Sequence, residues 1–269
     1  RASLKSGEER LVDLLKAEQV GMSWRTGFAL INHYTANNQW QQAVETGKKY
    51  IKKYPSNYYI GLKYAKALCE TGQYQPCISL LNKMQVLPNE GSYAGRAVYR
   101  AANLYQAMEQ LSRKNYRQVM RNVEASKEWP ENLGVGKPYD DMIDSRLEDY
   151  LEAKALMGQG DNQKAATLLS SVAGYKTSRS RFGSGNLLTA LALRELGKEV
   201  EADRMVASWE TDFPENRITQ WCAAVYRGEM EKASGMLKSR NEQADTTPWE
   251  TSFRDSNFDL IVRLFSTAD

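Results

Sequence analysis

One spacing recurs along this sequence and constrains its fold more than any other feature: a turn-forming residue is followed, five positions later, by a small or branched side chain. Six such side chains mark the repeat, at intervals of 31 to 46 residues: Ala43, Cys77, Val119, Ala165, Ala202 and Ala233. Glycine stands five residues before four of them. Asparagine, which also tolerates left-handed backbone, stands before Ala43. In the unit of Val119 a lysine, Lys114, takes this place.

Aromatic residues and prolines extend each unit of this pattern. Trp40, Tyr74 and Tyr116 each lie three residues before one of the six small or branched side chains. Four prolines lie eleven or twelve residues after one, where a proline ends a helix of about three turns: Pro55, Pro88, Pro130 and Pro214. The pattern therefore predicts a helix, a tight turn, a second helix and a stop. One such pair leaves apolar faces uncovered, so neighbouring pairs must stack.

The glycine, the aromatic before a small residue and the terminal proline resemble the tetratricopeptide repeat. The resemblance implies an α-solenoid, a right-handed superhelix of about six helix-turn-helix units. No segment alternates apolar and polar residues as a half-buried strand does, so the expected class is all-α. We expect a single repeat domain over residues 1–269, with units at about 22–55, 57–88, 92–130, 140–173, 184–214 and 216–240.

Both ends of the chain carry helical signals. Gly7 and Val12 repeat the five-residue spacing, so residues 8–20 are expected to form the second helix of a truncated unit. Residues 255–266 are too apolar for a free tail, and we expect a terminal helix that closes the stack. The chain begins at Arg1 without an apolar leader, which is typical of an expressed fragment or a processed chain. Its location, cytoplasmic or periplasmic, stays open.

Composition argues against several classes of function. The 36 basic and 33 acidic residues give a net charge of +3, below the basic excess typical of a nucleic-acid binder. No apolar run approaches the roughly 18–20 residues of a membrane helix, so no membrane insertion is expected. His33 is the single histidine and no catalytic motif surrounds it, so we expect no enzyme, no metal site and no cofactor. Cys69 and Cys77 are interpreted as two buried thiols, with a disulfide as the alternative.

A narrower resemblance covers most of this chain and is most evident within residues 88–150. The segments Pro88-Asn89-Glu90-Gly91, Arg96-Ala97-Val98-Tyr99-Arg100 and Trp129–Pro138 resemble the C-terminal repeat region of large bacterial proteins. In those proteins the N-terminal part is a β-rich, mutarotase-like domain of unknown function. The resemblance implies a helical platform attached to a sugar-processing domain that this sequence does not contain, and it implies no catalytic residue.

In tetratricopeptide proteins the first helix of each unit lines a concave groove. The resemblance therefore implies a partner-binding groove, lined by Arg25, Phe28, Asn32, Tyr59, Lys63 and Lys66. Residues 1–100 hold 14 basic and 7 acidic side chains, which favours an acidic partner for this half of the chain. The main hypothesis is a non-catalytic protein–protein interaction or scaffold module that binds a partner segment in this groove.

The long connection over residues 129–140 fits two interpretations. It is either a packed connector between units or a ligand loop, whose candidate residues are Trp129, Asn132, Lys137, Tyr139 and Asp140. Its Gly134-Val135-Gly136-Lys137 run lacks the earlier glycine and the following serine or threonine of a phosphate-binding loop. The alternative hypothesis for function is a repeat module that positions or completes a carbohydrate-active site in a longer parent protein.

Overall fold

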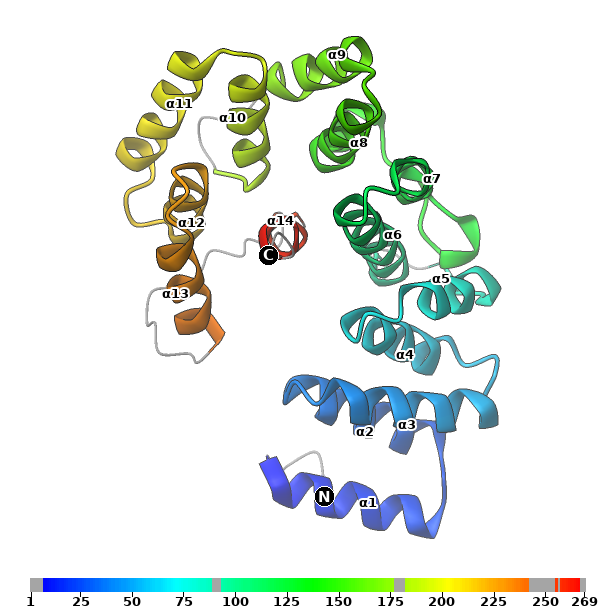
Figure 1. Ribbon diagram of the computed structural model, residues 1–269. Helices are drawn as coiled ribbons and strands as arrows, with labels where there is room; N and C mark the ends of the chain where they lie inside the picture. The colour runs from blue at the N-terminus through cyan, green and yellow to red at the C-terminus, as the bar shows by residue number, and fades with distance from the viewer. Residues whose placement is uncertain (1–6, 89–92, 177–181, 242–254, 256, 267–269) are drawn as a thin grey trace. The chain divides into compact units, whose positions relative to one another are not determined.

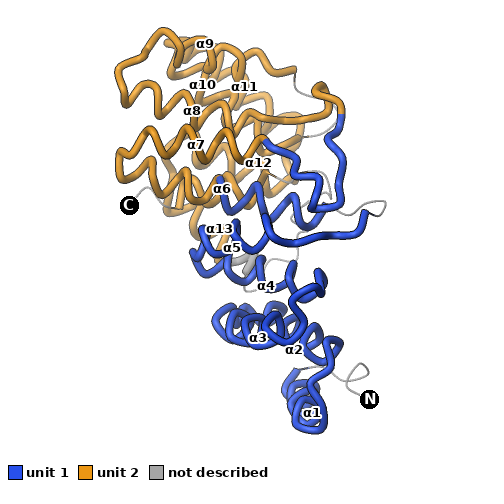
Figure 2. The backbone as a smooth tube through the Cα atoms, turned by 90° about the vertical axis from the view of Figure 1, so that its right-hand side faces the viewer, with its two compact units in different colours: residues 1–103, 128–138 blue, residues 104–127, 139–269 orange. Residues whose placement is uncertain are grey.

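The computed structural model describes residues 7–88, 93–176, 182–241, 255 and 257–266 (Figure 1). Within these ranges the chain forms fourteen α-helices, two short 3-10 helices and no β-strand, which confirms the expected all-α class. The chain divides into two compact units (Figure 2). Unit 1 holds residues 1–103 and 128–138, and unit 2 holds residues 104–127 and 139–269.

Unit 1 is built from five complete helices and the first half of a sixth. These are α1 (Gly7–Val20), α2 (Trp24–Ala36), α3 (Trp40–Lys53), α4 (Tyr58–Glu70), α5 (Tyr74–Lys83) and the first part of α6 (Ala94–Ser112). Each helix from α1 to α4 packs against the next one in the chain, and α2 also packs against α4. Helix α1 contacts α2 and buries Leu14, whereas Val12 and Leu15 stay exposed.

Unit 2 holds the rest of α6 and eight further helices. These are α7 (Tyr116–Lys127), α8 (Arg146–Gln159), α9 (Asn162–Ala173), α10 (Gly185–Glu195), α11 (Glu199–Asp212), α12 (Arg217–Tyr226), α13 (Met230–Asn241) and α14 (Phe258–Ser266). Helices α7 to α13 again pack each against the next, and α10 also packs against α8 and α12. Contacts between the first helices of consecutive pairs, as of α2 with α4 and of α8 with α10, are typical of a helical repeat.

The same turn joins the two helices of each pair and explains the recurring glycines. Its key residue has positive φ at all six predicted positions: Asn38, Gly72, Lys114, Gly160, Gly197 and Gly228. The next residue donates its N–H to the carbonyl five residues earlier, as from Gln73 to Leu68 and from Lys198 to Leu193, at 2.8 and 2.9 Å. This bond satisfies a helix-end carbonyl, and glycine adopts the left-handed conformation without strain. Lys114 adopts it at φ 58° without that advantage.

The six small or branched residues of the repeat are all buried, each on the second helix of a pair. Their relative exposure is between 0 and 2%. Because protein interiors are close-packed, a small side chain at this place lets the neighbouring helix approach. The three cysteines are likewise buried and unbonded, and the Sγ of Cys77 donates to the carbonyl of Ala65 at 3.1 Å. The interpretation of Cys69 and Cys77 as two thiols is therefore confirmed.

Enlarging a buried repeat residue is expected to destabilise the fold. Ala202→Leu and Ala165→Leu each add three carbons to a packed helix contact and should lower the free energy of unfolding by roughly 1–3 kcal/mol. Ala207→Leu is the matched control, because Ala207 lies exposed on the same helix α11 as Ala202. Urea denaturation measures all three variants. Equal stability of Ala202→Leu and Ala207→Leu would count against the register of the repeat.

Candidate functional site

Four aromatic residues and two cations gather on the side of unit 1 formed by α2 and α4. The predicted groove residues come from these two helices: Arg25, Phe28 and Asn32 from α2, and Tyr59, Lys63 and Lys66 from α4. Spacings of three and four residues place each set along one side of its helix. We call the surface of Trp24, Arg25, Phe28, Tyr58, Tyr59 and Lys63 the α2/α4 face.

Tyr59 is the centre of the α2/α4 face. Its ring stacks on Trp24 with centroids 5.7 Å apart and on Tyr58 at 4.2 Å, and it meets Phe28 edge-on at 6.3 Å. Despite these contacts Tyr59 is 45% exposed, so the stack is open to solvent on one side. The hydrogen bond that Tyr58 shares with Tyr59 raises the pKa of Tyr58 above its ordinary value. The rings thus hold one another in place and present a ready apolar surface.

Cations flank the aromatic stack. The guanidinium of Arg25 lies 4.6 Å from the centre of the Trp24 ring, and the ammonium of Lys63 lies 5.5 Å from the centre of the Phe28 ring. Such contacts fix long side chains near an apolar surface while their donors stay available to an anion. Lys66 lies one turn beyond Lys63 and pairs with Glu70 on the same helix. Asn32 lies one turn beyond Phe28 and is half-buried.

Sequence reasoning missed two members of this face, Trp24 and Tyr58. Trp24 could have been predicted from helical spacing, because it lies four residues before Phe28 and therefore on the same side of α2. Tyr58 had none, since adjacent residues on a helix point about 100° apart. It joins Tyr59 because it lies at the first position of α4, directly after the capping residue Asn57, whose side chain accepts the N–H of Ile60.

The first half of the candidate ligand loop is bonded to the end of α5 and packs against α6 within unit 1. The side-chain amide of Asn132 donates to the carbonyls of Leu81 and Met84 at 2.9 and 2.8 Å, and its backbone carbonyl accepts the N–H of Val86 at 2.8 Å. Trp129 lies under the guanidinium of Arg96, 4.6 Å from its ring centre. These bonds satisfy carbonyls at the end of α5, so Trp129 and Asn132 have the environment of a packed connector.

The second half of that loop is more open. Lys137 is exposed and belongs to unit 1, whereas Tyr139 and Asp140 belong to unit 2. Tyr139 is 79% exposed, and Asp140 begins the 3-10 helix η3 (Asp140–Met142). The five candidate residues therefore differ in environment, and only Lys137, Tyr139 and Asp140 present side chains on an exposed surface.

Unit 2 contains a buried polar cluster around Arg146 that sequence reasoning also missed. The guanidinium donates to both carboxylate oxygens of Asp144 at 2.9 and 2.7 Å, and to Asn186 and Thr189 at 3.0 and 3.1 Å. The ring of Tyr175 covers it at 4.0 Å. An arginine guanidinium carries five N–H donors in one plane and can therefore bind several acceptors at once. Because its partners Asn186 and Thr189 lie on α10, Arg146 holds α8 against α10.

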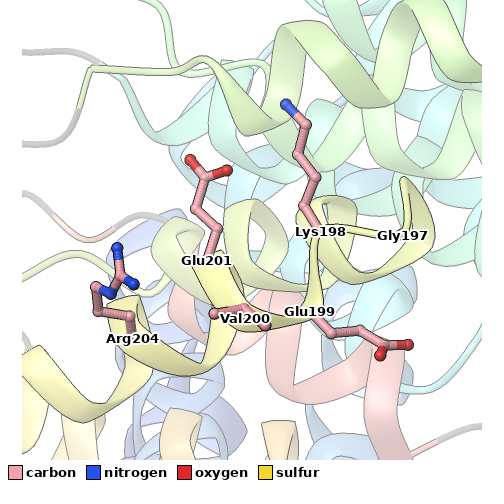
Figure 3. Close-up of a pocket in the computed structure, with 6 residues that line it drawn as sticks. All are labelled: Gly197, Lys198, Glu199, Val200, Glu201 and Arg204. Carbon is pink, nitrogen blue, oxygen red and sulfur yellow. The ribbon is translucent and has the colours of Figure 1, made fainter.

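A shallow pocket in unit 2 offers little chemistry. It is lined by Gly197, Lys198, Glu199, Val200, Glu201 and Arg204, at the turn into α11 (Figure 3). All six residues are exposed; in the picture Glu199 points away from Lys198, Glu201 and Arg204, and the charged ends of these three lie apart from one another. Specific ligand sites are concave, with polar groups that converge on one point, and this pocket lacks that convergence.

The described residues hold little that indicates another kind of site. No group of three or more histidine, cysteine, aspartate or glutamate side chains in that part of the chain is placed to hold a metal ion. None of its helices has the length and apolarity required to cross a bilayer. No protein-family model matches the chain, and no curated protein is significantly similar to it.

Proposed function

We propose that this chain is a tetratricopeptide-like helical repeat module that binds a segment of another protein on the α2/α4 face, without catalysing a reaction. The exposed stack of Tyr59 on Trp24, with Arg25 and Lys63 beside it, carries this proposal. In a right-handed superhelix of the tetratricopeptide kind, α2 and α4 are first helices of consecutive units and line the groove. The proposal therefore joins the repeat register to one particular surface.

The chemistry of the face favours a peptide with apolar and acidic residues. Aromatic side chains and arginine dominate the energy of protein interfaces, and aromatic rings bury much area while they lose little conformational entropy. Arg25 and Lys63 supply donors for a carboxylate next to the rings, and arginine suits a carboxylate through two parallel bonds. Residues 1–100 carry 14 basic against 7 acidic side chains, which attracts the same class of partner over a longer range.

Removal of the central ring is expected to abolish most of this binding. A peptide library displayed on phage, selected on the wild-type chain, should yield segments with acidic and apolar residues. Tyr59→Ala should weaken the selected peptide at least tenfold, about 1.4 kcal/mol, because Tyr59 touches the other three rings of the face. Tyr93→Ala is the control, since Tyr93 is an exposed tyrosine of unit 1 outside this face. Fluorescence anisotropy measures both dissociation constants.

The dependence of binding on salt concentration distinguishes the contribution of charge attraction from that of the ring contacts. The association rate should fall as ionic strength rises, while the loss caused by Tyr59→Ala should persist at high salt, because ring contacts are not screened. A selected peptide that binds Tyr59→Ala and Tyr93→Ala equally well would show that the α2/α4 face is not the binding surface.

One observation favours a second candidate, a module that contributes to a carbohydrate-active site in a longer protein. The stacked rings are open to solvent at Tyr59 rather than sealed between helices, and open aromatic rings are also typical of sugar-binding surfaces. However, Tyr59 already uses ring surface on Trp24 and Tyr58, which leaves less of it for a sugar. Glycan-array binding that is lost in Tyr59→Ala, together with an empty peptide selection, would favour this candidate over the first.

A further inference from the structure

The C-terminal helix α14 lies on the first helices of unit 2. Its Phe258 and Phe265 both meet the ring of Trp221 on α12 edge-on, with centroids 5.3 and 6.4 Å apart. Its Arg263 lies 5.6 Å from the ring centre of Tyr105 on α6. Phe258, Leu260 and Ile261 are buried by this placement. Figure 1 shows α14 with α6, α8, α10 and α12 around it.

The residues just before α14 extend the contact to two more first helices. The carboxylate of Asp255 accepts the N–H and the hydroxyl of Ser184, the residue before α10, both at 2.8 Å. The side-chain amide of Asn257 donates to Asp144, two residues before α8, at 3.4 Å. The segment over Asp255 and 257–266 therefore touches the first helices, or their starts, of four successive pairs. A helix that merely ended the stack would instead lie against α13.

We infer that this first-helix face of unit 2 is a recognition site for an amphipathic helix, and that α14 is its occupant within the chain, which a partner helix of the same pattern replaces. The pattern is an acid three residues before an aromatic, then apolar residues three and seven positions later: Asp255, Phe258, Ile261 and Phe265. Spacings of three and seven place anchors on one side of a helix, as in other helix-in-groove complexes. This site lies outside the α2/α4 face and goes beyond the proposed function.

The fit of α14 to its site is incomplete. The indole N–H of Trp221, the side chain on which both phenylalanines of α14 rest, is buried and finds no hydrogen-bond partner among the described residues. Buried donors are nearly always paired in native proteins, and an unpaired one weakens the arrangement that buries it. Because α14 leaves the indole N–H of Trp221 unsatisfied, a helix that carries an asparagine, glutamine or glutamate beside its aromatic anchor has an advantage over α14.

The test adds the α14 segment to the full chain as a separate peptide. A labelled synthetic peptide of residues 255–266 should bind the double variant Phe258→Ala/Ile261→Asp at least ten times more tightly than the wild type. In the wild type the tethered helix competes, at an effective concentration that reaches about the millimolar range for short linkers. A peptide carrying Asp255→Ala and Phe258→Ala is the control and should not bind. Equal binding to both chains, or binding to neither, would overturn the inference.

A second measurement uses the wild-type residues of α14 and therefore does not depend on correct folding of the double variant. A protease site placed within residues 242–254 of the wild-type sequence is cut after folding, and the labelled peptide is then added. The expected result is exchange of the cut fragment for the peptide, while circular dichroism shows that the rest of the chain keeps its helices. A fragment that never exchanges is an ordinary part of the core, and the inference is then wrong. Tyr59→Ala should leave the exchange unchanged, which separates this site from the proposed function.

Discussion

Arg146→Ala is expected to lower the free energy of unfolding by about 2–4 kcal/mol. Arg146 is 6% exposed and donates to Asp144, Asn186 and Thr189. Its removal leaves the buried amide of Asn186 and the hydroxyl of Thr189 without this donor, while the partly exposed carboxylate of Asp144 keeps the backbone N–H of residue 146 and the amide of Asn257. Polar groups that lose a partner in a largely buried cluster cost more than the intact contacts contribute, and this asymmetry makes the expected loss large. Chemical denaturation followed by circular dichroism measures it.

Two further variants show whether the geometry of Arg146 matters or only its charge. Arg146→Lys keeps the charge but cannot make the two parallel bonds to Asp144, so it should retain only part of the stability. Arg113→Ala removes an exposed arginine that pairs with Glu109 and should cost under about 1 kcal/mol. If Arg146→Ala were as mild as Arg113→Ala, the buried cluster would not have the structural role assigned to it.

Trp221→Ala is the second change with a large expected effect, about 3–5 kcal/mol in the free energy of unfolding. Trp221 is among the largest fully buried side chains, and both phenylalanines of α14 rest on it. Its removal leaves a cavity that the surrounding helices fill only in part. The loss should include the docking of α14, so protease cleavage after residue 241 should become faster in this variant.

Trp221→Phe is the matched control for the unsatisfied indole. Phenylalanine keeps most of the buried ring and removes the N–H that has no acceptor. Removal of an unpaired buried donor relieves a penalty of about 1–3 kcal/mol, which offsets part of the lost packing. Trp221→Phe should therefore cost far less than Trp221→Ala, under about 1.5 kcal/mol. A loss as large as that of Trp221→Ala would mean that the N–H does have a partner in solution.

The helices and their turns were predictable because they depend on local chemistry. A residue with positive φ costs least as glycine or asparagine, so the turns at Asn38 and Gly72 leave a mark in the sequence. The turn at Lys114 lacks this mark and was identified through the spacing of its neighbours. Burial of the small residues followed from the same register, since each must face the partner helix.

The contacts of unit 2 that join distant parts of the chain were not predictable in the same way. Arg146 meets Asn186 across 40 residues, and Asp255 meets Ser184 across 71, and neither pair has a local pattern. The apolar side chains of α14 predict that it packs, but not which helices it packs against. On the α2/α4 face, the resemblance to the tetratricopeptide repeat implied Arg25, Phe28, Tyr59 and Lys63 as groove residues. It did not identify Tyr58, which stacks on its own neighbour.

Photo-cross-linking tests most directly whether the α2/α4 face binds a partner. A photoreactive benzophenone side chain is placed at position 59 of the full chain, where its aromatic ring imitates that of Tyr59. The same group at position 93 is the control, and cross-linked products from the source cells are identified by mass spectrometry. If the α2/α4 face binds a partner, position 59 should capture a reproducible protein through a segment rich in acidic and apolar residues. Arg25→Ala in the same chain should reduce the yield. Equal capture at positions 59 and 93, or capture at neither position by a folded chain, would contradict the proposal that the α2/α4 face binds a partner.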